Sequence, residues 1–397
     1  MKKGKYMRLI FLIMFSLCFL CAWTITSQTS NRIVIENSVS PTPNPTPTPT
    51  PTPTPNPTQW IMGYYVGYQR NLLPVDRIDF TRITHLVVGR VIPNQDGSIN
   101  TNLDINSSEG PVLASLLSKA AHDNGRKAIL MVGDAGTHWY WTQAANDTNR
   151  ARFISNLLST MDNLGYDGLD LDWEPIYQTD KPMLSYLIQE LRRQRPSMIL
   201  MLPVGWVREN SQADSWIASM APYLDKIGIM SYSMTGAWQG WLTWHSSALE
   251  AHGARYPSSI KSSVNKYLAT GIPKGKLVFG VGFYGMCWKG TTEPRQETEG
   301  TSIVGSDNVM SYRNIIEKYF VQSAYKWDSM AKVSYLTYPN GHGELGCNFI
   351  SYDDEQSLRL KGEYAKSEGL GGILVWTINQ EYIPSLSRNP PLEALTR

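Results

Sequence analysis

Eight apolar segments of the β-strand type constrain the fold of this chain more than any other feature. They occupy residues 60–68, 83–91, 127–134, 167–174, 198–205, 226–233, 276–285 and 371–378. Amphipathic stretches lie between them. The stretch 150–165 ends in Gly165, as at a helix C-cap, and the stretch 180–195 opens with Asp180 and Pro182, as at a helix N-terminus. Near-continuous apolar strands that alternate with helices are typical of a parallel sheet buried on both faces.

The number of these segments predicts a (β/α)8 barrel, because eight is the strand count of that fold and roughly 340 residues suffice to build it. A doubly wound open sheet is the alternative, although no G-x-G-x-x-G sequence follows the first segment. The gap between the seventh and eighth segments is too long for one crossover helix. We therefore expect a small extra subdomain there.

The N-terminus has the composition of an export signal. A basic stretch at residues 1–8 precedes an apolar stretch at 9–23, which predicts that residues 1–27 are a signal peptide or a retained membrane anchor. Residues 28–58 include an alternating Pro-Thr segment, which predicts a disordered, extended linker. The protein is thus expected to be secreted or extracellular. Simple secretion and anchoring at the cell surface both remain open.

The composition argues against several other classes of protein. The formal net charge is +2 and 11% of residues are aromatic, so there is no electrostatic footprint for nucleic acid. The histidines and cysteines show no metal-ligand spacing, so neither a metal nor a cofactor is expected. Nothing indicates an obligate protein partner, and a monomer is expected. In an exported chain Cys287 and Cys347 can form a disulfide, while two unpaired small apolar residues are the alternative.

The segment DGLDLDWE, residues 167–174, places acids inside a strand that is otherwise apolar. Because strand side chains alternate, Asp170, Asp172 and Glu174 face one way and the apolar residues between them face the other. In a barrel the acids would point inward and climb to the C-terminal mouth, where barrel enzymes carry their chemistry. Carboxyl groups this close cannot all ionise at neutral pH, so one that stays protonated can act as a general acid.

Two other readings of these acids remain. They could lie on a solvated edge strand, or they could bind a divalent cation with Asp134 as a further ligand. The apolar residues between the acids argue against the first reading. A shortage of additional oxygen ligands argues against the second.

The same segment matches D-G-x-D-x-D-x-E, the signature of glycoside hydrolase family 18, the chitinases and their relatives. The resemblance extends over residues 60–385 and includes GYY at 63–65, MSY at 230–232 and GFYG at 282–285. It implies that residues 59–397 form a catalytic (β/α)8 TIM barrel. It also implies a small α+β insertion at roughly residues 286–350, between strands seven and eight.

The resemblance implies hydrolysis of β-1,4 bonds beside N-acetylglucosamine, with retention and through an oxazolinium intermediate that the substrate's own acetamido group forms. Glu174 would protonate the leaving oxygen and then activate water. Asp172 would hold the acetamido N–H, Asp170 would tune Asp172 from below, and Tyr232 would hydrogen-bond the acetamido oxygen. Chitin or another N-acetylglucosamine polysaccharide would be the partner.

Substrate-binding side chains are expected around these acids. Trp376 matches the tryptophan that forms the floor under the distorted sugar, and Tyr64, Met230 and Tyr284 match positions around the pocket. Tryptophan-rich segments follow the third and sixth strands, and we expect Trp141 and Trp238 from these segments to stack on sugar faces.

Three positions depart from the family pattern. Ser233 stands where an aspartate usually follows Tyr232, and Met131 and Asp134 replace the serine and the second glycine of the third-strand S-x-G-G. Two alternative functions follow from the same motif. One is an endo-β-N-acetylglucosaminidase acting on glycans or peptidoglycan. The other is a non-catalytic chitin-binding lectin, which the presence of Glu174 disfavours.

Overall fold

The computed structural model describes residues 59–251, 253 and 255–397. The predicted export segment and the Pro/Thr-rich linker lie outside these residues and stay predictions. Within the described ranges no helix combines the length and apolar character needed to cross a membrane.

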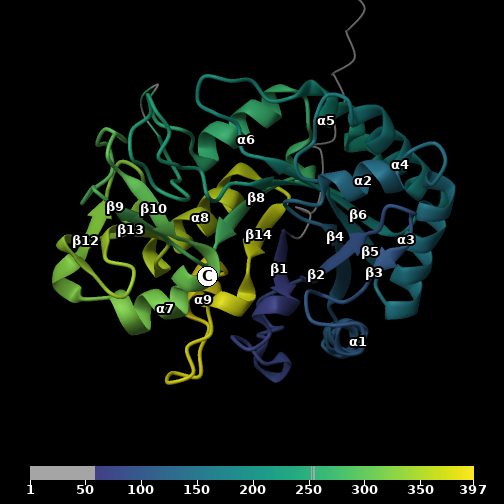
Figure 1. Cartoon of the computed structure of the whole chain (residues 1–397), viewed down its shortest axis with the longest axis horizontal. Coiled ribbons are helices and arrows are strands. Elements are labelled where there is room, and N and C mark those ends of the chain that lie inside the picture. The colour runs from purple at the N-terminus through teal and green to yellow at the C-terminus, as the bar shows by residue number, and fades with distance from the viewer. Residues whose placement is uncertain (1–58, 252, 254) are drawn as a thin grey trace, which may run out of the picture. The chain divides into compact units, whose positions relative to one another are not determined.

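Parallel strands close into the barrel that the sequence predicts (Figure 1). The strands are β1 (Trp60–Val66), β2 (His85–Pro93), β4 (Lys127–Gly133), β5 (Gly168–Asp172), β6 (Ile199–Gly205), β7 (Lys226–Met230), β8 (Leu277–Gly282) and β14 (Gly372–Trp376). Closure comes from β1, which pairs in parallel with β14 on one side and with β2 on the other. The short strand β3 (Ile99–Asn100) pairs antiparallel with β2. Each of these barrel strands coincides with one of the eight apolar segments.

Helices surround the barrel and connect its strands (Figure 1). The helices of the described residues are α1 (Glu109–Asp123), α2 (His138–Ala144), α3 (Arg150–Leu164), α4 (Lys181–Gln194), α5 (Ser215–Met220), α6 (Ile260–Ala269), α7 (Tyr312–Asn314), α8 (Glu355–Glu368) and α9 (Pro390–Leu395). Of these, α7 belongs to the segment inserted between the last two barrel strands, and α9 follows the last strand. The predicted helix ends are confirmed. Gly165 caps α3 with a φ of 76°, a left-handed conformation that favours glycine, and Asp180 is the N-cap of α4.

Side-chain alternation along the strands produces two apolar layers. Leu169, Leu171 and Trp173 belong to the large layer between the barrel and its helices. A smaller cluster fills the barrel interior and includes Met62, Tyr64, Val87, Ile129, Met131, Met201, Val278 and Leu374. The acids on the inward face of β5 therefore rise from an apolar base toward the strand ends.

A second, antiparallel sheet is inserted between β8 and β14. It contains β9 (Met286–Lys289), β10 (Ser302–Gly305), β11 (Tyr325–Asp328), β12 (Val333–His342) and β13 (Cys347–Tyr352), in the order β10-β9-β13-β12-β11. Cys287 and Cys347 form a disulfide between the neighbouring strands β9 and β13, with a Cα–Cα distance of 5.3 Å. Of the two alternatives for these cysteines, the disulfide is the one that the structure contains.

Candidate active site

The acidic column begins inside the barrel with Asp170. Its carboxyl group is fully buried, and Oδ2 accepts a 2.8 Å hydrogen bond from the hydroxyl of Tyr64 on β1. The other oxygen, Oδ1, has no hydrogen-bond partner among the described residues. A buried carboxyl with one donor is poorly solvated when ionised, so this position favours the protonated form.

Asp172 and Glu174 continue the column toward the mouth. Asp172 is buried, whereas Glu174, which lies just beyond the end of β5, is partly exposed. Trp173 points the other way, and its ring stacks on that of Trp141 with centroids 5.0 Å apart. The side chains therefore point alternately to the two faces of the strand, as the sequence predicts. This alternation continues beyond Asp172, the last residue of β5.

All three carboxyl groups of the column bind protons more strongly than ordinary side chains. Burial raises the pKa of Asp170 to about 7. Burial, with the charge of Asp134 as the next cause, raises the pKa of Glu174 to about 7. The pKa of Asp172 is raised well above its ordinary value by burial and by the nearby Glu174. The column thus retains protons at pH values where exposed carboxyl groups have lost theirs.

A cavity of about 420 Å³ opens over the upper end of the column. It is lined by Tyr68, Asp134, Ala135, Asp172, Glu174, Gly205, Trp206, Met230, Tyr232, Ser233, Asp307 and Trp376. A second cavity of about 420 Å³ shares Glu174, Gly205, Trp206 and Met230 with the first. Glu174 therefore lies where the two cavities meet.

The structure brings most of the expected site residues together. Tyr232, Met230 and Trp376 all line the first cavity. The rings of Tyr232 and Trp376 lie nearly parallel, with an interplanar angle of 24° and centroids 6.4 Å apart. Tyr232 follows the end of β7 and Trp376 is the last residue of β14, so one aromatic surface is built from segments far apart in the sequence.

Two predicted pocket residues lie behind the cavity wall instead. Tyr64 is buried and contacts Asp170 rather than the cavity. Tyr284 is also buried, and its hydroxyl lies 2.6 Å from Oγ of Ser233, which does line the cavity. Both tyrosines therefore hold residues of the site in place and do not themselves form its surface.

The prediction that Trp141 stacks on a sugar is wrong. Its side chain is completely buried, packed face to face on Trp173 and edge to face on Phe153, so it forms part of the layer between barrel and helices. Trp238 is exposed and its ring stacks on Trp206 at 6.1 Å. Trp238 does not itself line either cavity, but it supports a tryptophan that lines both.

Tyr68 and Asp307 belong to the cavity wall but were not singled out from the sequence. Trp206, for which packing in the core was an equal alternative, lines the cavity as well. Tyr68 lies in the turn η1 (Gly67–Gln69) at the mouth end of β1, and its position at the end of the first apolar segment could have indicated it. Asp307 lies in η5 (Asp307–Met310) of the insertion. Its Oδ1 accepts a 2.9 Å hydrogen bond from Gln380. No local sequence pattern predicts this contact.

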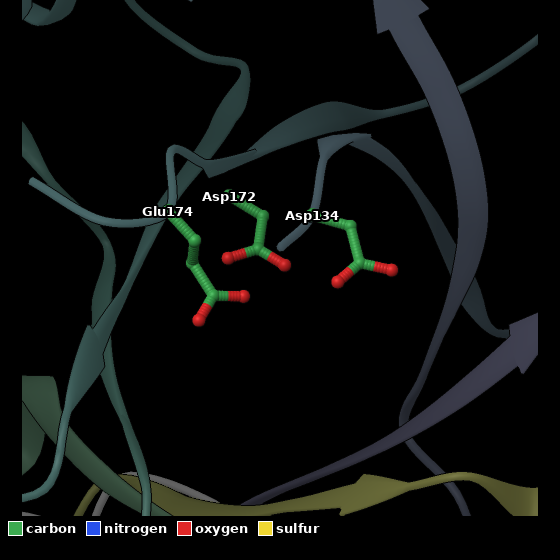
Figure 2. Close-up of side chains that lie close together, drawn as sticks. All are labelled: Asp134, Asp172 and Glu174. Atoms are coloured by element: carbon green, nitrogen blue, oxygen red, sulfur yellow. The ribbon is translucent and has the colours of Figure 1, made fainter. Parts of the chain in front are cut away.

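Asp134, Asp172 and Glu174 form an acid cluster whose nearest carboxylate oxygens all lie within 4.8 Å of one another. Figure 2 shows the three carboxyl groups pointing into the same space, with Asp172 between the other two. A calcium ion takes about six to eight oxygen ligands, more than three carboxyl groups supply when each contributes one oxygen. Arg90 already lies 3.2 Å from Asp134. The arrangement therefore suits proton exchange between carboxyl groups better than metal binding.

Comparison with known proteins gives a family. The sequence model described as glycosyl hydrolases family 18 matches residues 60–381. A "chitinase-like effector" of Moniliophthora perniciosa is 24% identical, over 81% of this chain and 83% of the relative. "Chitinase A1" of Niallia circulans is 28% identical over 64% of this chain, but the match spans only 40% of that longer protein.

Solved structures give the same fold. The Group IV chitinase of Ostrinia furnacalis, in complex with allosamidin, superposes with a TM-score of 0.73 and 25% sequence identity. The match covers 85% of this chain and 97% of the insect chain. The two chains therefore share their fold along nearly the whole length of the insect chain.

Proposed function

This chain belongs to glycosyl hydrolases family 18, and we propose that it hydrolyses β-1,4 bonds of chitin or chito-oligosaccharides. One observation carries the proposal. Glu174, a carboxyl group that holds its proton to about pH 7, lies in a cavity with Asp172, Tyr232 and Trp376. A general acid works best when its pKa is close to the operating pH.

In the proposed reaction the sugar to be cleaved lies over the ring of Trp376. The acetamido oxygen attacks the anomeric carbon as the bond to the leaving oxygen breaks, and Glu174 gives its proton to that oxygen. Asp172 accepts a hydrogen bond from the acetamido N–H and offsets the positive charge of the oxazolinium ion. Glu174 then takes a proton from water, which attacks the anomeric carbon with net retention.

Asp170 and Tyr232 have supporting roles in this proposal. Asp170 accepts a hydrogen bond from Tyr64 and lies beneath Asp172. Asp170 and Asp172 exchange protons, so the total number of protons on the column stays nearly constant through the reaction. Tyr232 lines the cavity and has a pKa raised well above its ordinary value by burial, so its hydroxyl stays a donor. It would donate to the acetamido oxygen.

Export of the protein is part of the proposal, because chitin is an extracellular polymer. The basic and apolar character of residues 1–27 supports it. Release into the medium and attachment to the cell through this segment are distinguished by fractionating producing cells and detecting the full chain.

The test is hydrolysis of chito-oligosaccharides by the full chain and by its Glu174→Gln variant. We expect cleavage by the wild type and a loss of at least about 10³-fold in the variant, since the glutamine can neither give nor take the proton. Glu299→Gln, at an exposed position outside both cavities, is the matched control and should retain activity.

Other outcomes would point to the alternatives. Cleavage of glycoprotein glycans or peptidoglycan, but not of chito-oligosaccharides, would make the protein an endo-β-N-acetylglucosaminidase. Equally tight chito-oligosaccharide binding by the wild type and Glu174→Gln, with no cleavage by either, would make it a lectin.

A further inference from the structure

Asp134 has a backbone conformation that an aspartate adopts only at a cost. It follows β4 with a φ of 135°, within the region that favours glycine. Its backbone N–H donates a 2.9 Å hydrogen bond to the carbonyl oxygen of Asp172, so the neighbouring strand fixes this conformation. Strained residues of this kind cluster at functional sites, so the side chain of Asp134 is a candidate for a functional role.

The carboxyl group of Asp134 is held in one place from two sides. Oδ1 accepts a hydrogen bond of 2.5 Å from the backbone N–H of Ala135. Oδ2 lies 3.2 Å from Nη1 of Arg90, whose Nε lies 2.9 Å from Asp104. These contacts keep the Asp134 carboxylate beside Asp172 and Glu174, within the acid cluster (Figure 2).

We propose that Asp134 is a positioning residue that acts through Glu174: its negative charge delays the loss of the Glu174 proton as pH rises. This inference rests on the proposed function, because it assigns the alkaline limit of activity to that proton. Asp134 replaces a glycine of the family pattern. The replacement adds a negative charge beside the general acid Glu174 and also introduces backbone strain at residue 134.

The charges around this pair are consistent with such a role. Besides Arg90 and Asp104, the charged and titratable groups that interact with Asp134 or Glu174 are Tyr68, Asp170, Asp172, Tyr232, Tyr284 and Asp307. Among these groups only Arg90 is basic. Burial raises the pKa of Asp134, and the charge of Arg90 opposes part of that rise. After burial, the charge of Asp134 is the largest cause of the raised pKa of Glu174.

The test compares the pH dependence of kcat/KM for a fluorogenic chito-oligosaccharide between the wild type and Asp134→Asn. Asparagine keeps the size of the side chain and the acceptor for Ala135, but it removes the charge. We expect the alkaline pKa of the profile to fall by roughly one unit, because a like charge within a few ångströms is lost. Asp104→Asn changes the more distant partner of Arg90, and it should leave that pKa nearly unchanged.

Asp134→Gly separates electrostatics from backbone strain. It should lower the alkaline pKa as Asp134→Asn does, and it should also raise the melting temperature, because glycine adopts this φ freely. An alkaline pKa that is the same in the wild type and Asp134→Asn would overturn the proposal. So would a rise in KM alone, which would make Asp134 a substrate contact.

A readout without turnover keeps this inference separate from the proposed function. The Glu174 carboxyl can be titrated by ¹³C NMR in the full chain labelled at glutamate, with Glu174→Gln identifying its signal. A lower Glu174 pKa in Asp134→Asn would support the inference even if the wild type cleaved nothing, whereas an unchanged value would overturn it.

Discussion

The hydroxyl of Tyr64 donates a 2.8 Å hydrogen bond to Oδ2 of Asp170, at the base of the acids that rise to the cavity. Both side chains are buried. Burial raises the pKa of Asp170, and the Tyr64 hydrogen bond opposes this rise. The tyrosine therefore makes the lowest carboxyl group of the column easier to ionise than burial alone would, although it does not line the cavity.

Replacing Tyr64 by phenylalanine should destabilise the protein more at pH 8 than at pH 5. At pH 8 the ionised Asp170 loses its donor, which should cost about 1–3 kcal/mol of unfolding free energy. Denaturant unfolding at both pH values measures the difference. Tyr65→Phe is the matched control, because that hydroxyl bonds the neutral carbonyl oxygen of Leu73. Equal losses at both pH values in Tyr64→Phe would contradict the role assigned to Tyr64.

Asp170→Asn should make the protein more stable above neutral pH. The pKa of Asp170 rises from 3.8 to about 7 on folding. Such a carboxyl group costs no stability below about pH 4, and its cost grows to about 4 kcal/mol as pH rises through 7. Asparagine does not titrate, so the gain should appear at pH 8 and be absent at pH 4. A gain that did not depend on pH would refute this assignment of the raised pKa.

Trp206 and Trp141 should respond differently to substitution. Trp206 lines both cavities, so Trp206→Ala should raise the KM for chito-oligosaccharides about tenfold, the equivalent of one lost stacking contact. Trp141 is buried, so Trp141→Phe should lower the unfolding free energy by about 1–3 kcal/mol and leave KM unchanged. If Trp141→Phe raised KM without loss of stability, the burial of Trp141 would have to be reconsidered.

Removing the disulfide should weaken the inserted sheet. Cys287 and Cys347 close a loop with a sequence separation of 60, for which loop entropy gives about 4 kcal/mol as an upper estimate. The Cys287→Ala/Cys347→Ala double variant should therefore melt at a lower temperature. Thiol titration of the denatured, unreduced wild type provides the independent check: labelling of both Cys287 and Cys347 would show that the bridge does not form.

Chelation should leave hydrolysis intact. The acid cluster is proposed to exchange protons and not to hold a metal ion, so activity in excess EDTA should stay within about twofold of the untreated rate. Assays before and after dialysis against EDTA measure this. Loss of activity that returned only on addition of a divalent cation would assign the cluster to a metal.

The barrel and the acidic column could be predicted because both depend on short-range regularities. Alternation along a strand decides on its own that Asp170, Asp172 and Glu174 share a face, and helix signals such as Gly165 act within one turn. Eight such strands with helices between them leave few topologies open. The disulfide, by contrast, was one of two alternatives until β9 and β13 were seen to be neighbours.

The cavity wall could not be predicted in the same way. A tryptophan in a connecting segment can face either a groove or the core, and sequence alone led to the wrong choice for Trp141. Asp307 reaches the cavity from the insertion, and Arg90 reaches Asp134 from another strand. Such contacts depend on the packing of long connecting segments, and no local sequence pattern predicts them.

The sequence by itself therefore determined the strands, the helices between them and which side chains share the inward face, because these follow from backbone periodicity within a few residues. Only the tertiary structure decided the distances between groups from different strands, the depth of their burial and hence the proton affinity of Glu174. Those quantities depend on desolvation and on charges that the chain brings together across long separations.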